Sequence, residues 1–228
     1  MTDTTETDAD VVVDSARRQR TRQRLMDAAF EVFAEQGVHA AAIETIAERA
    51  GFSRGAFYSN FETKFELFIA LAERENAMRL ERLHELVAGL PSGFEFPQGV
   101  DEIAELVEKF LSVDAGGATW CLILGEFRML ALRDPDTARQ FLEFQRRLDG
   151  ELGAMLAATI GQLGMEFTIA PVEFARLAAV VYEAAVQESI LSGEPTMLAR
   201  ESLPKLVQAF TRAAGPEAEG RLETKAHE

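Results

Sequence analysis

Residues 53–60 place several groups that can bind nucleic acid within one short stretch. The residues are Ser53, Arg54, Gly55, Tyr58, Ser59 and Asn60. A guanidinium can pair bidentately with guanine, and hydroxyl and amide groups commonly donate to phosphate oxygens. This set predicts a surface that meets phosphates and base edges.

The residues around this stretch favour a helix-turn-helix that would present it. Ala47 is small enough for two helices to touch at a steep angle, and Gly51 accepts the positive φ that the corner needs. Ser53 can cap the second helix. The apolar residues with the spacing to fill the angle are Ile46, Ala50, Phe52 and Phe57. A plain helical hairpin would also carry the alanine and the glycine, but it would not need an arginine, a tyrosine and an asparagine on its outer face.

Helical periodicity dominates the chain, and no strand-like alternation of useful length is present. We expect helices at residues 17–36, 43–50, 54–60, 63–87, 100–113, 119–132, 135–163, 171–192 and 203–214. Thr63 and Glu66 form a predicted capping box, and Asp134 is a predicted N-cap before Pro135. Pro204 fits only in the first turn of the last helix. The predicted fold class is therefore all-α.

The net charge of −15 is unusual for a nucleic-acid-binding chain, but it is unevenly distributed. Residues 1–14 carry −5, residues 15–64 carry +2 and residues 65–228 carry −12. The base-rich piece is thus the piece with the helix-turn-helix. The acidic remainder should repel DNA and orient the docking, although acidic side chains also simply solvate helices.

The composition argues against several other classes of protein. One cysteine, Cys121, cannot form an internal disulfide framework. No apolar run is long enough for a membrane span, and the acidic residues 1–10 are unlike a signal peptide, so we expect a cytoplasmic protein. The histidines have no metal-ligand partner three or four residues on, and we find no phosphate-binding glycine loop or nucleophile elbow. We therefore expect no enzyme activity, no metal and no cofactor.

Residues 21–67 resemble the tetracycline-repressor (TetR) family of transcription factors. The resemblance rests on residues 22–37, 46–51, 53–58 and 60–64, which read RQRLMDAAFEVFAEQG, IAERAG, SRGAFY and NFETK. It implies that residues 16–64 form a three-helix, helix-turn-helix DNA-binding domain. Residues 65–214 would then form a helical ligand-binding and dimerisation bundle. The ends, at residues 1–15 and 215–228, are expected to be a disordered acidic tail and a frayed polar tail.

The resemblance also implies roles for individual residues. Arg54 would face base edges in the major groove, and Gly55 would let the backbone approach the DNA. Tyr58 and Lys64 would contact phosphates, and Asn60 occupies a position that is often a polar DNA contact. Arg54 could instead bind a phosphate without reading bases, and the ring of Tyr58 could simply pack.

The sequence departs from the family pattern in the helix at 43–50 and just after it. That helix usually opens with a Ser or Thr that caps it and touches phosphate, but residues 41–43 have no hydroxyl. Thr45 is the remaining hydroxyl on the helix, and we keep it as a candidate DNA contact. Ala56 stands where a threonine is common. Residues 17–20, Arg-Arg-Gln-Arg, could reach the DNA as an arm or could form a solvated helix start.

A second candidate site lies on the expected helices at 119–132, 135–163 and 171–192. The first of these is apolar nearly all round, so we expect it to be buried on most sides. An apolar lining with few polar groups suits a small molecule. The candidate ligand-binding residues are Trp120, Ile123, Leu124, Phe127, Phe141, Leu148, Leu152, Met155, Tyr182 and Gln187. They could instead be ordinary core, and Glu126, Arg128 and Glu183 would bias ligand choice only if they face inward.

The last two expected helices are candidates for a homodimer interface. Small and apolar residues on them include Ala178, Val181, Ala185, Leu206, Val207 and Phe210. In the family, the last two helices of each subunit pair across a two-fold axis as a four-helix bundle. The alternative is that these residues pack within the subunit.

Together these expectations describe a homodimeric repressor that a small, largely apolar molecule releases from a palindromic operator. The helix at 63–87 would transmit the effect of the ligand and change the separation of the two recognition helices. One alternative is a DNA-binding regulator of the same fold whose C-terminal part only dimerises or binds a protein partner. Another is an enzyme or transport protein that keeps the helical fold without binding DNA.

Overall fold

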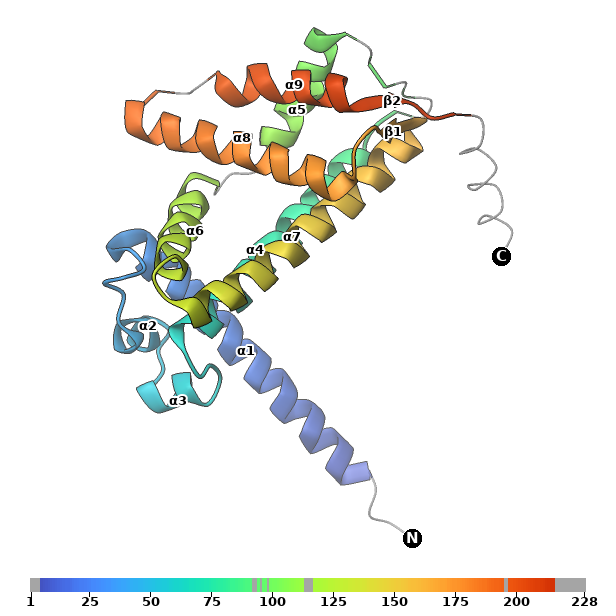
Figure 1. Ribbon diagram of the computed structural model, residues 1–228. Helices are drawn as coiled ribbons and strands as arrows, with labels where there is room; N and C mark the ends of the chain where they lie inside the picture. Colours follow the sequence, from blue (N-terminus) through green and yellow to red (C-terminus); the bar gives the residue numbers. More distant parts are fainter. Residues whose placement is uncertain are drawn as a thin grey trace. The chain divides into compact units, whose positions relative to one another are not determined.

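The computed structural model of the chain describes residues 5–91, 94, 96–97, 99–112, 117–194 and 197–215 (Figure 1). These residues form nine α-helices and two short strands. The elements are α1 Thr5–Gln36, α2 Ile43–Arg49, α3 Arg54–Tyr58, α4 Lys64–Ala88, α5 Val100–Ser112, α6 Gly117–Ala131, α7 Pro135–Gln162, β1 Met165–Phe167, α8 Pro171–Ser192, α9 Leu198–Phe210 and β2 Thr211–Ala213. The helical fold class is confirmed.

The chain divides into two compact units. The first unit comprises Met1–Glu75 and Leu122–Phe141, and the second comprises Asn76–Cys121 and Leu142–Glu228. The division cuts through α4, α6 and α7. The first unit therefore includes the start of α4 and the end of α6, besides the helix-turn-helix expected at 16–64.

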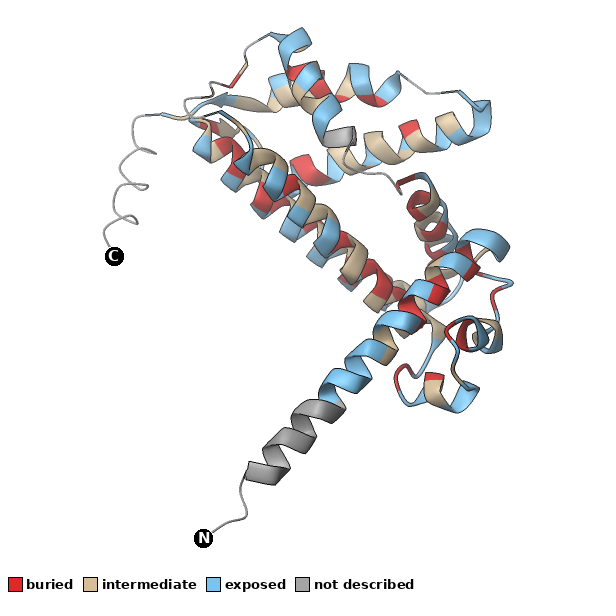
Figure 2. Ribbon diagram, turned by 180° about the vertical axis from the view of Figure 1, so that it is seen from behind, coloured by how far each residue is buried: buried red, intermediate tan, exposed pale blue. Residues whose placement is uncertain are grey.

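In the first unit, α1, α2 and α3 contribute to one apolar core. Side chains three and four positions apart on α1 share a face, and that face is buried. Residues 15–20 of α1 are exposed and burial begins at Leu25, a change that can be followed along the helix in Figure 2. The main buried side chains of the core are Leu25, Ala29, Val32, Phe33, Ile46, Ala47, Phe57, Phe61, Phe68 and Phe127.

Phe127 brings the end of α6 into this core. Its ring stacks on Phe68 with the two ring centroids 3.5 Å apart, and it meets the ring of Phe33 nearly edge-on at 5.7 Å. Buried aromatic pairs of this kind add stability beyond the area that they remove from water. The end of α6 is thus held to the same core as α1 and α4.

In the second unit, the later part of α4 runs beside α7 (Figure 1). Asn76 of α4 donates to the carboxylate of Glu151 on α7 at 2.9 Å. α7 also approaches the start of α8 at Gly153, where a Cβ atom would lie 2.8 Å from the backbone nitrogen of Val172 and 2.9 Å from the carbonyl carbon of Pro171. Only glycine leaves room for this close approach.

The helix α9 packs against α5 and α8, and it has two apolar contacts. Ala199 and Leu203 lie against Ala185 of α8, with Val107 of α5 beside them. Val207 packs against a cluster formed by Phe96, Ile103, Ile160 and Met165. The chain then continues into β2, which pairs antiparallel with β1, Met165 opposite Ala213 and Phe167 opposite Thr211.

Three expectations about the elements differ from the structure. α1 begins at Thr5, inside the stretch expected to be disordered. α9 begins at Leu198, so Pro204 lies inside the helix and not in its first turn. Pro204 and its neighbour Leu203 are buried, and packing of this kind outweighs the local helix propensity. The β1–β2 ribbon is too short to give an alternating pattern.

The helix α6 is also less buried than its composition predicts, because Leu122 and Met129 are exposed on it. Residues 1–4 and 216–228 of the expected tails, and residue 113 at the end of an expected helix, lie outside the described residues. Within the described part of the chain, no helix is long and apolar enough to cross a membrane.

Candidate nucleic-acid interface

The short helix α3 is built to present its outer face. Ser53 caps it as predicted, accepting a hydrogen bond from the backbone N–H of Ala56 at 3.2 Å. Phe57 anchors the inner face, because its side chain is fully buried beside Phe61. Arg54, Gly55, Tyr58 and Ser59 remain exposed, so the predicted outward position of these four residues is confirmed.

Arg54 has two partners on this surface. Its Nη1 lies 2.8 Å from the Oε1 carboxylate oxygen of Glu44 on α2, and its Nη2 donates to the hydroxyl of Tyr58 at 3.5 Å. The guanidinium also lies 5.5 Å from the centre of the Tyr58 ring. Both the hydroxyl of Tyr58 and the carboxylate of Glu44 raise the pKa of Arg54, so Arg54 stays cationic.

Tyr58 and Ser59 differ in what they offer to a ligand. The Tyr58 ring meets the Phe57 ring nearly edge-on at 5.5 Å, yet the residue is 45% exposed. Its ring packs while its hydroxyl stays at the surface beside Arg54. The hydroxyl of Ser59 donates to the carbonyl of Gly55 at 3.0 Å, and a serine oxygen can still accept.

Asn60 is wrongly predicted to face outward. It is 9% exposed, and its side-chain amide donates to the carbonyl of Ala56 at 2.8 Å. Its backbone carbonyl accepts from Arg22, whose guanidinium lies 4.0 Å above the ring of Phe61. Asn60 therefore stabilises the C-terminal end of α3 from its buried side and does not face solvent.

Lys64 also has a different position from the one expected of a phosphate contact. Its ammonium donates to the backbone carbonyls of Val38 at 2.6 Å and Ala41 at 2.9 Å, with His39 at 3.4 Å. These bonds account for the three donors of an ammonium group. Burial lowers the pKa of Lys64, and the carboxylate of Glu126 opposes part of this shift.

Glu126 holds the same loop from the other side. Its Oε2 accepts the backbone N–H of Val38 at 2.6 Å. The loop between α1 and α2 is thus fixed through its carbonyls by α4 and through an N–H by α6. Glu126, one of the residues expected to bias ligand choice if it faced inward, instead faces the loop between α1 and α2.

The turn between α2 and α3 is held by Arg24 of α1. Arg24 of α1 donates to the carbonyl of Ala50 at 2.7 Å, and its guanidinium lies 4.6 Å from the centre of the Phe52 ring. Gly51 has a φ of 73°, and a Cβ there would lie 2.8 Å from the Arg24 side chain. The glycine is needed for both reasons.

The other candidate DNA contacts are less clearly placed for that role. Thr45 is half-buried on α2. Residues 17–20 are helical and exposed, and both alternatives for them, an arm that reaches the DNA and a solvated helix start, stay predictions. Sequence reasoning missed Glu44, because nothing in the pattern indicates that an acid of α2 lies beside Arg54.

The candidate ligand-binding residues fall into both units. Ile123, Leu124, Phe127 and Phe141 belong to the first unit, and Trp120, Leu148, Leu152, Met155, Tyr182 and Gln187 belong to the second. Trp120 and Met155 are buried, and Leu148, Leu152 and Tyr182 are half-buried. Phe127 packs in the aromatic core described above, and Gln187 is exposed. These two residues are therefore not placed as an inward-facing lining requires.

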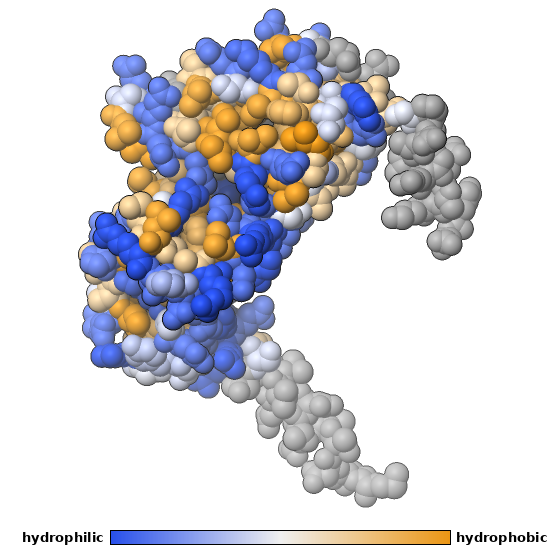
Figure 3. Space-filling model, in the orientation of Figure 1, coloured by the Kyte–Doolittle hydropathy of each residue, from blue (hydrophilic) through white to orange (hydrophobic). Residues whose placement is uncertain are grey.

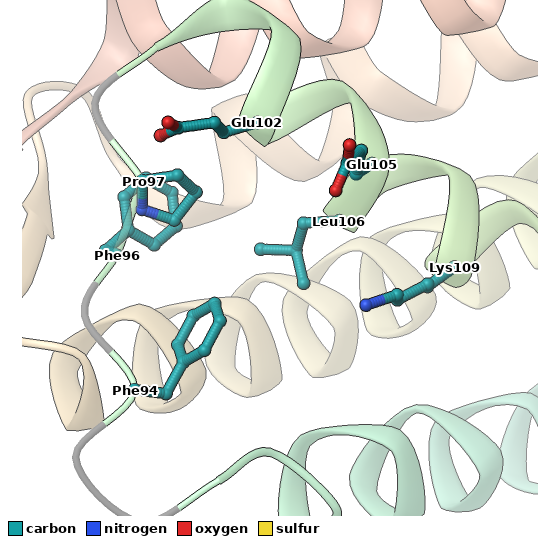
Figure 4. A pocket seen from close by; sticks show the side chains of 7 residues that line it. All are labelled: Phe94, Phe96, Pro97, Glu102, Glu105, Leu106 and Lys109. Atoms are coloured by element: carbon teal, nitrogen blue, oxygen red, sulfur yellow. The ribbon is translucent and has the colours of Figure 1, made fainter.

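A pocket of about 430 Å³ lies in the second unit, between Phe94, Phe96 and Pro97 and one side of α5 (Figure 4). Phe94, Phe96, Pro97 and Leu106 are its apolar lining residues. Its charged lining residues are Glu102, Glu105 and Lys109. The lining includes none of the predicted ligand-binding residues.

The helix α8 has two apolar faces. Ala178, Val181 and Ala185, predicted at the dimer interface, pack with residues of α9 within the subunit. Leu177, Val180 and Leu191 lie on an adjacent face of the helix and are exposed, the last of them 88% exposed. Figure 3 shows hydrophobic residues gathered over the region of α8 and α9.

Comparison with known proteins finds a similarity to bacterial regulators in part of the first unit. The sequence model of bacterial regulatory proteins, tetR family, matches residues 25–71. The HTH-type transcriptional regulator SrpR of Pseudomonas putida is 46% identical over 68 residues, which are 29% of this chain and 32% of SrpR. The chain thus matches about a third of the length of that relative.

Two further similarities extend over most of the chain. The HTH-type transcriptional repressor AcnR of Corynebacterium efficiens is 26% identical over 189 residues, which are 82% of this chain and 88% of AcnR. The crystal structure of the transcriptional regulator FadR of Bacillus subtilis, in complex with stearoyl-CoA, superposes with a TM-score of 0.59 at 20% identity. That alignment covers 81% of this chain and 96% of FadR.

Proposed function

Because this chain belongs to the TetR family of transcriptional regulators, we propose that it is a homodimeric repressor that a small, largely apolar molecule releases from a palindromic operator. The observation that carries the DNA-binding part is the outer face of α3. A capped, firmly anchored helix presents Arg54, Gly55 and Tyr58 to solvent together. Such a helix fits the major groove of B-DNA.

Two features support a dimer, namely the size of the reading surface and the exposed residues of α8. One helix of five residues offers too few base contacts for specific binding by a single chain. Leu177, Val180 and Leu191 form an exposed apolar face of a kind that marks protein interfaces. A two-fold dimer would place two α3 helices about 34–36 Å apart, one turn of DNA, on a near-palindrome.

A selection from random DNA duplexes tests this part of the proposal. We expect enrichment of a near-palindrome with two half-sites separated by about one helical turn, together with a dimer in sedimentation at micromolar concentration. Failure to enrich any sequence would overturn the assignment of α3 as a reading helix. A monomer that binds an isolated half-site tightly would overturn the dimer.

For the ligand, we propose a site in the second unit beside Trp120, Leu148, Leu152 and Tyr182. Trp120 is buried and the other three are half-buried, which suits an apolar guest. FadR, solved with stearoyl-CoA, gives a precedent for an apolar chain bound by a protein of this fold. The ligand can act only by binding one conformation better than another.

Two helices could transmit such a preference to the DNA-binding unit. α4 runs from the second unit to Lys64, which holds the loop between α1 and α2. α6 runs from Trp120 to Glu126 and Phe127, which hold the same loop and the aromatic core. We therefore propose that the effect of the ligand reaches the loop between α1 and α2 through α6 as well as through α4.

The only tryptophan of the chain, Trp120, gives a direct readout of ligand binding. Candidate apolar molecules that weaken operator binding should change its fluorescence. By linkage, a ligand that weakens operator binding about 100-fold must bind the DNA complex about 100-fold more weakly, a coupling of about 2.7 kcal/mol. In Trp120→Ala, the ligand should no longer weaken operator binding, and the operator affinity without ligand should be unchanged.

Leu106→Ala is the matched control for this experiment, because it alters the pocket beside α5 instead. A response that survives Trp120→Ala and is lost in Leu106→Ala would move the ligand to that pocket. The absence of a response to any small molecule in a screen, with specific operator binding intact, would favour a C-terminal part that only dimerises or takes a protein partner.

A further inference from the structure

Glu44 is the acidic residue nearest to the proposed reading side chain. Its Oε1 lies 2.8 Å from Nη1 of Arg54, and both side chains are open to solvent, at 49% and 63% exposure. Glu44 stands in the first turn of α2, and Arg54 is the first residue of α3. Whatever Arg54 contacts on DNA must therefore be contacted in the presence of this carboxylate.

The ion pair leaves Arg54 able to read a base. A guanidinium has five N–H donors, and Glu44 and Tyr58 each engage one of its two terminal nitrogens. Enough donors remain for the two parallel bonds that arginine makes to O6 and N7 of guanine. Two partners on one planar group also restrict its orientation before DNA arrives, so less freedom is lost on binding.

The carboxylate of Glu44 affects phosphate oxygens and base-edge acceptors differently when they bind Arg54. A phosphate carries a full negative charge, and a second anion beside the same guanidinium is unfavourable at these short distances. The acceptors on the edge of guanine are neutral, so they can share the guanidinium with Glu44. Binding to DNA of any sequence depends on phosphates, and discrimination depends on base edges.

We propose that Glu44 is a positioning residue that sets specificity, directing Arg54 to a guanine edge and away from phosphates. This inference rests on the proposed function, since it needs a chain that reads DNA through Arg54. It adds to that function an acid whose role is to reduce binding to the wrong DNA, as naturally specific interfaces often require.

Glu44→Gln tests the inference, with Glu48→Gln as the matched control. Glu48 is exposed on the same helix, so both variants remove one negative charge from α2. Each variant is measured against the selected duplex and against an unrelated duplex at several salt concentrations. We expect Glu44→Gln to lower the ratio of specific to non-specific affinity roughly tenfold, while Glu48→Gln leaves the ratio unchanged.

Duplexes with single base-pair changes locate the effect. The loss in Glu44→Gln should fall on the one position of each half-site that Arg54→Ala also relaxes, and it should vanish in the double variant with Arg54→Ala. A merely structural role would not move the preference at a single base pair. Melting temperatures should match the wild type, because exposed ion pairs contribute little stability.

The outcomes separate this inference from the function on which it rests. A wild-type chain without a preferred sequence overturns both. A chain that reads its operator, but whose Glu44→Gln variant keeps or raises the specificity ratio, overturns the role of Glu44 alone. A fall in the ratio that persists without Arg54 overturns it as well, because Glu44 would then act by another route.

Discussion

Arg54 stands at the surface of the first unit with its side chain 63% exposed, as the proposed contact with a base edge requires. We expect Arg54→Ala to weaken binding to the operator by about 1–3 kcal/mol and to relax sequence choice at one position of each half-site. Titration of duplexes with single base-pair changes measures both effects. Arg139→Ala, which removes an exposed arginine of α7, is the control. Equal weakening on every duplex would mean that Arg54 contacts only phosphate.

Gly55 allows a test of close approach that leaves the fold intact. A Cβ at this position would meet only the Ser53 hydroxyl oxygen, at an ordinary 3.7 Å. Gly55→Ala should therefore leave the free energy of unfolding unchanged or raise it by up to about 1 kcal/mol, through the higher helix propensity of alanine. The melting temperature measures this effect. Operator affinity should fall, because the new methyl group points into the space that DNA would occupy. Unchanged affinity would show that the backbone of α3 stays away from the DNA.

Lys64 should behave as a structural residue. Lys64→Met removes the ammonium that binds the carbonyls of Val38 and Ala41, so we expect a loss of about 1–3 kcal/mol in the free energy of unfolding. The salt dependence of operator binding should stay the same, whereas loss of a phosphate contact would reduce its slope by about 1. Lys205→Met, at an exposed lysine of α9, controls for the change in net charge. A reduced slope with unchanged stability would restore the role implied by the resemblance.

The sequence predicted the side chains that depend on local geometry and missed those that depend on distant partners. Ser53 caps α3 because the accepting hydroxyl and the N–H that donates to it lie three residues apart, a relation that the sequence contains. Asn60 is held with Arg22, and Lys64 with Val38. These partners lie 38 and 26 residues away in the chain, so only the folded arrangement reveals them.

At the scale of elements, α6 depends on Glu126 for its connection to the loop between α1 and α2. Glu126→Ala leaves the buried N–H of Val38 without its acceptor, so we expect a loss of about 1–3 kcal/mol of stability. Hydrogen exchange at the Val38 amide should speed up, and Glu143→Ala, at an exposed position of α7, should leave it unchanged. Protection of Val38 equal to the wild type would mean that the loop does not depend on α6.

The helices themselves were predictable where periodicity and end signals agree. Asp134 accepts the backbone N–H of Thr137 at 2.8 Å and begins α7 as expected. Thr63 likewise caps α4, although Glu66 accepts the N–H of Glu62 and not that of Thr63. The start of α9 was missed because Pro204 was read as a first-turn residue. The β1–β2 ribbon was missed because it depends on a pairing between segments 46 residues apart, such as Glu166 with Arg212.

At the scale of the whole molecule, the exposed face of α8 should decide the oligomeric state. We expect Val180→Glu to raise the monomer fraction in sedimentation and to weaken binding to the full palindrome, because it places a charge in the middle of an apolar face. Ala34→Glu, which adds the same charge at an exposed position of α1, should leave the dimer intact. A Val180→Glu protein that stays dimeric would move the interface to another surface.

Gly153 restricts which residues related chains can carry at this position of α7. A methyl group there would meet the backbone of Pro171 and Val172 at less than 3 Å, and backbone atoms cannot swing aside as the end of a side chain can. Gly150 and Gly161 of the same helix have open space around the position of a Cβ. In related chains that keep the contact between α7 and α8, we therefore expect various residues at positions 150 and 161. Position 153 should stay glycine, or change only together with the start of α8.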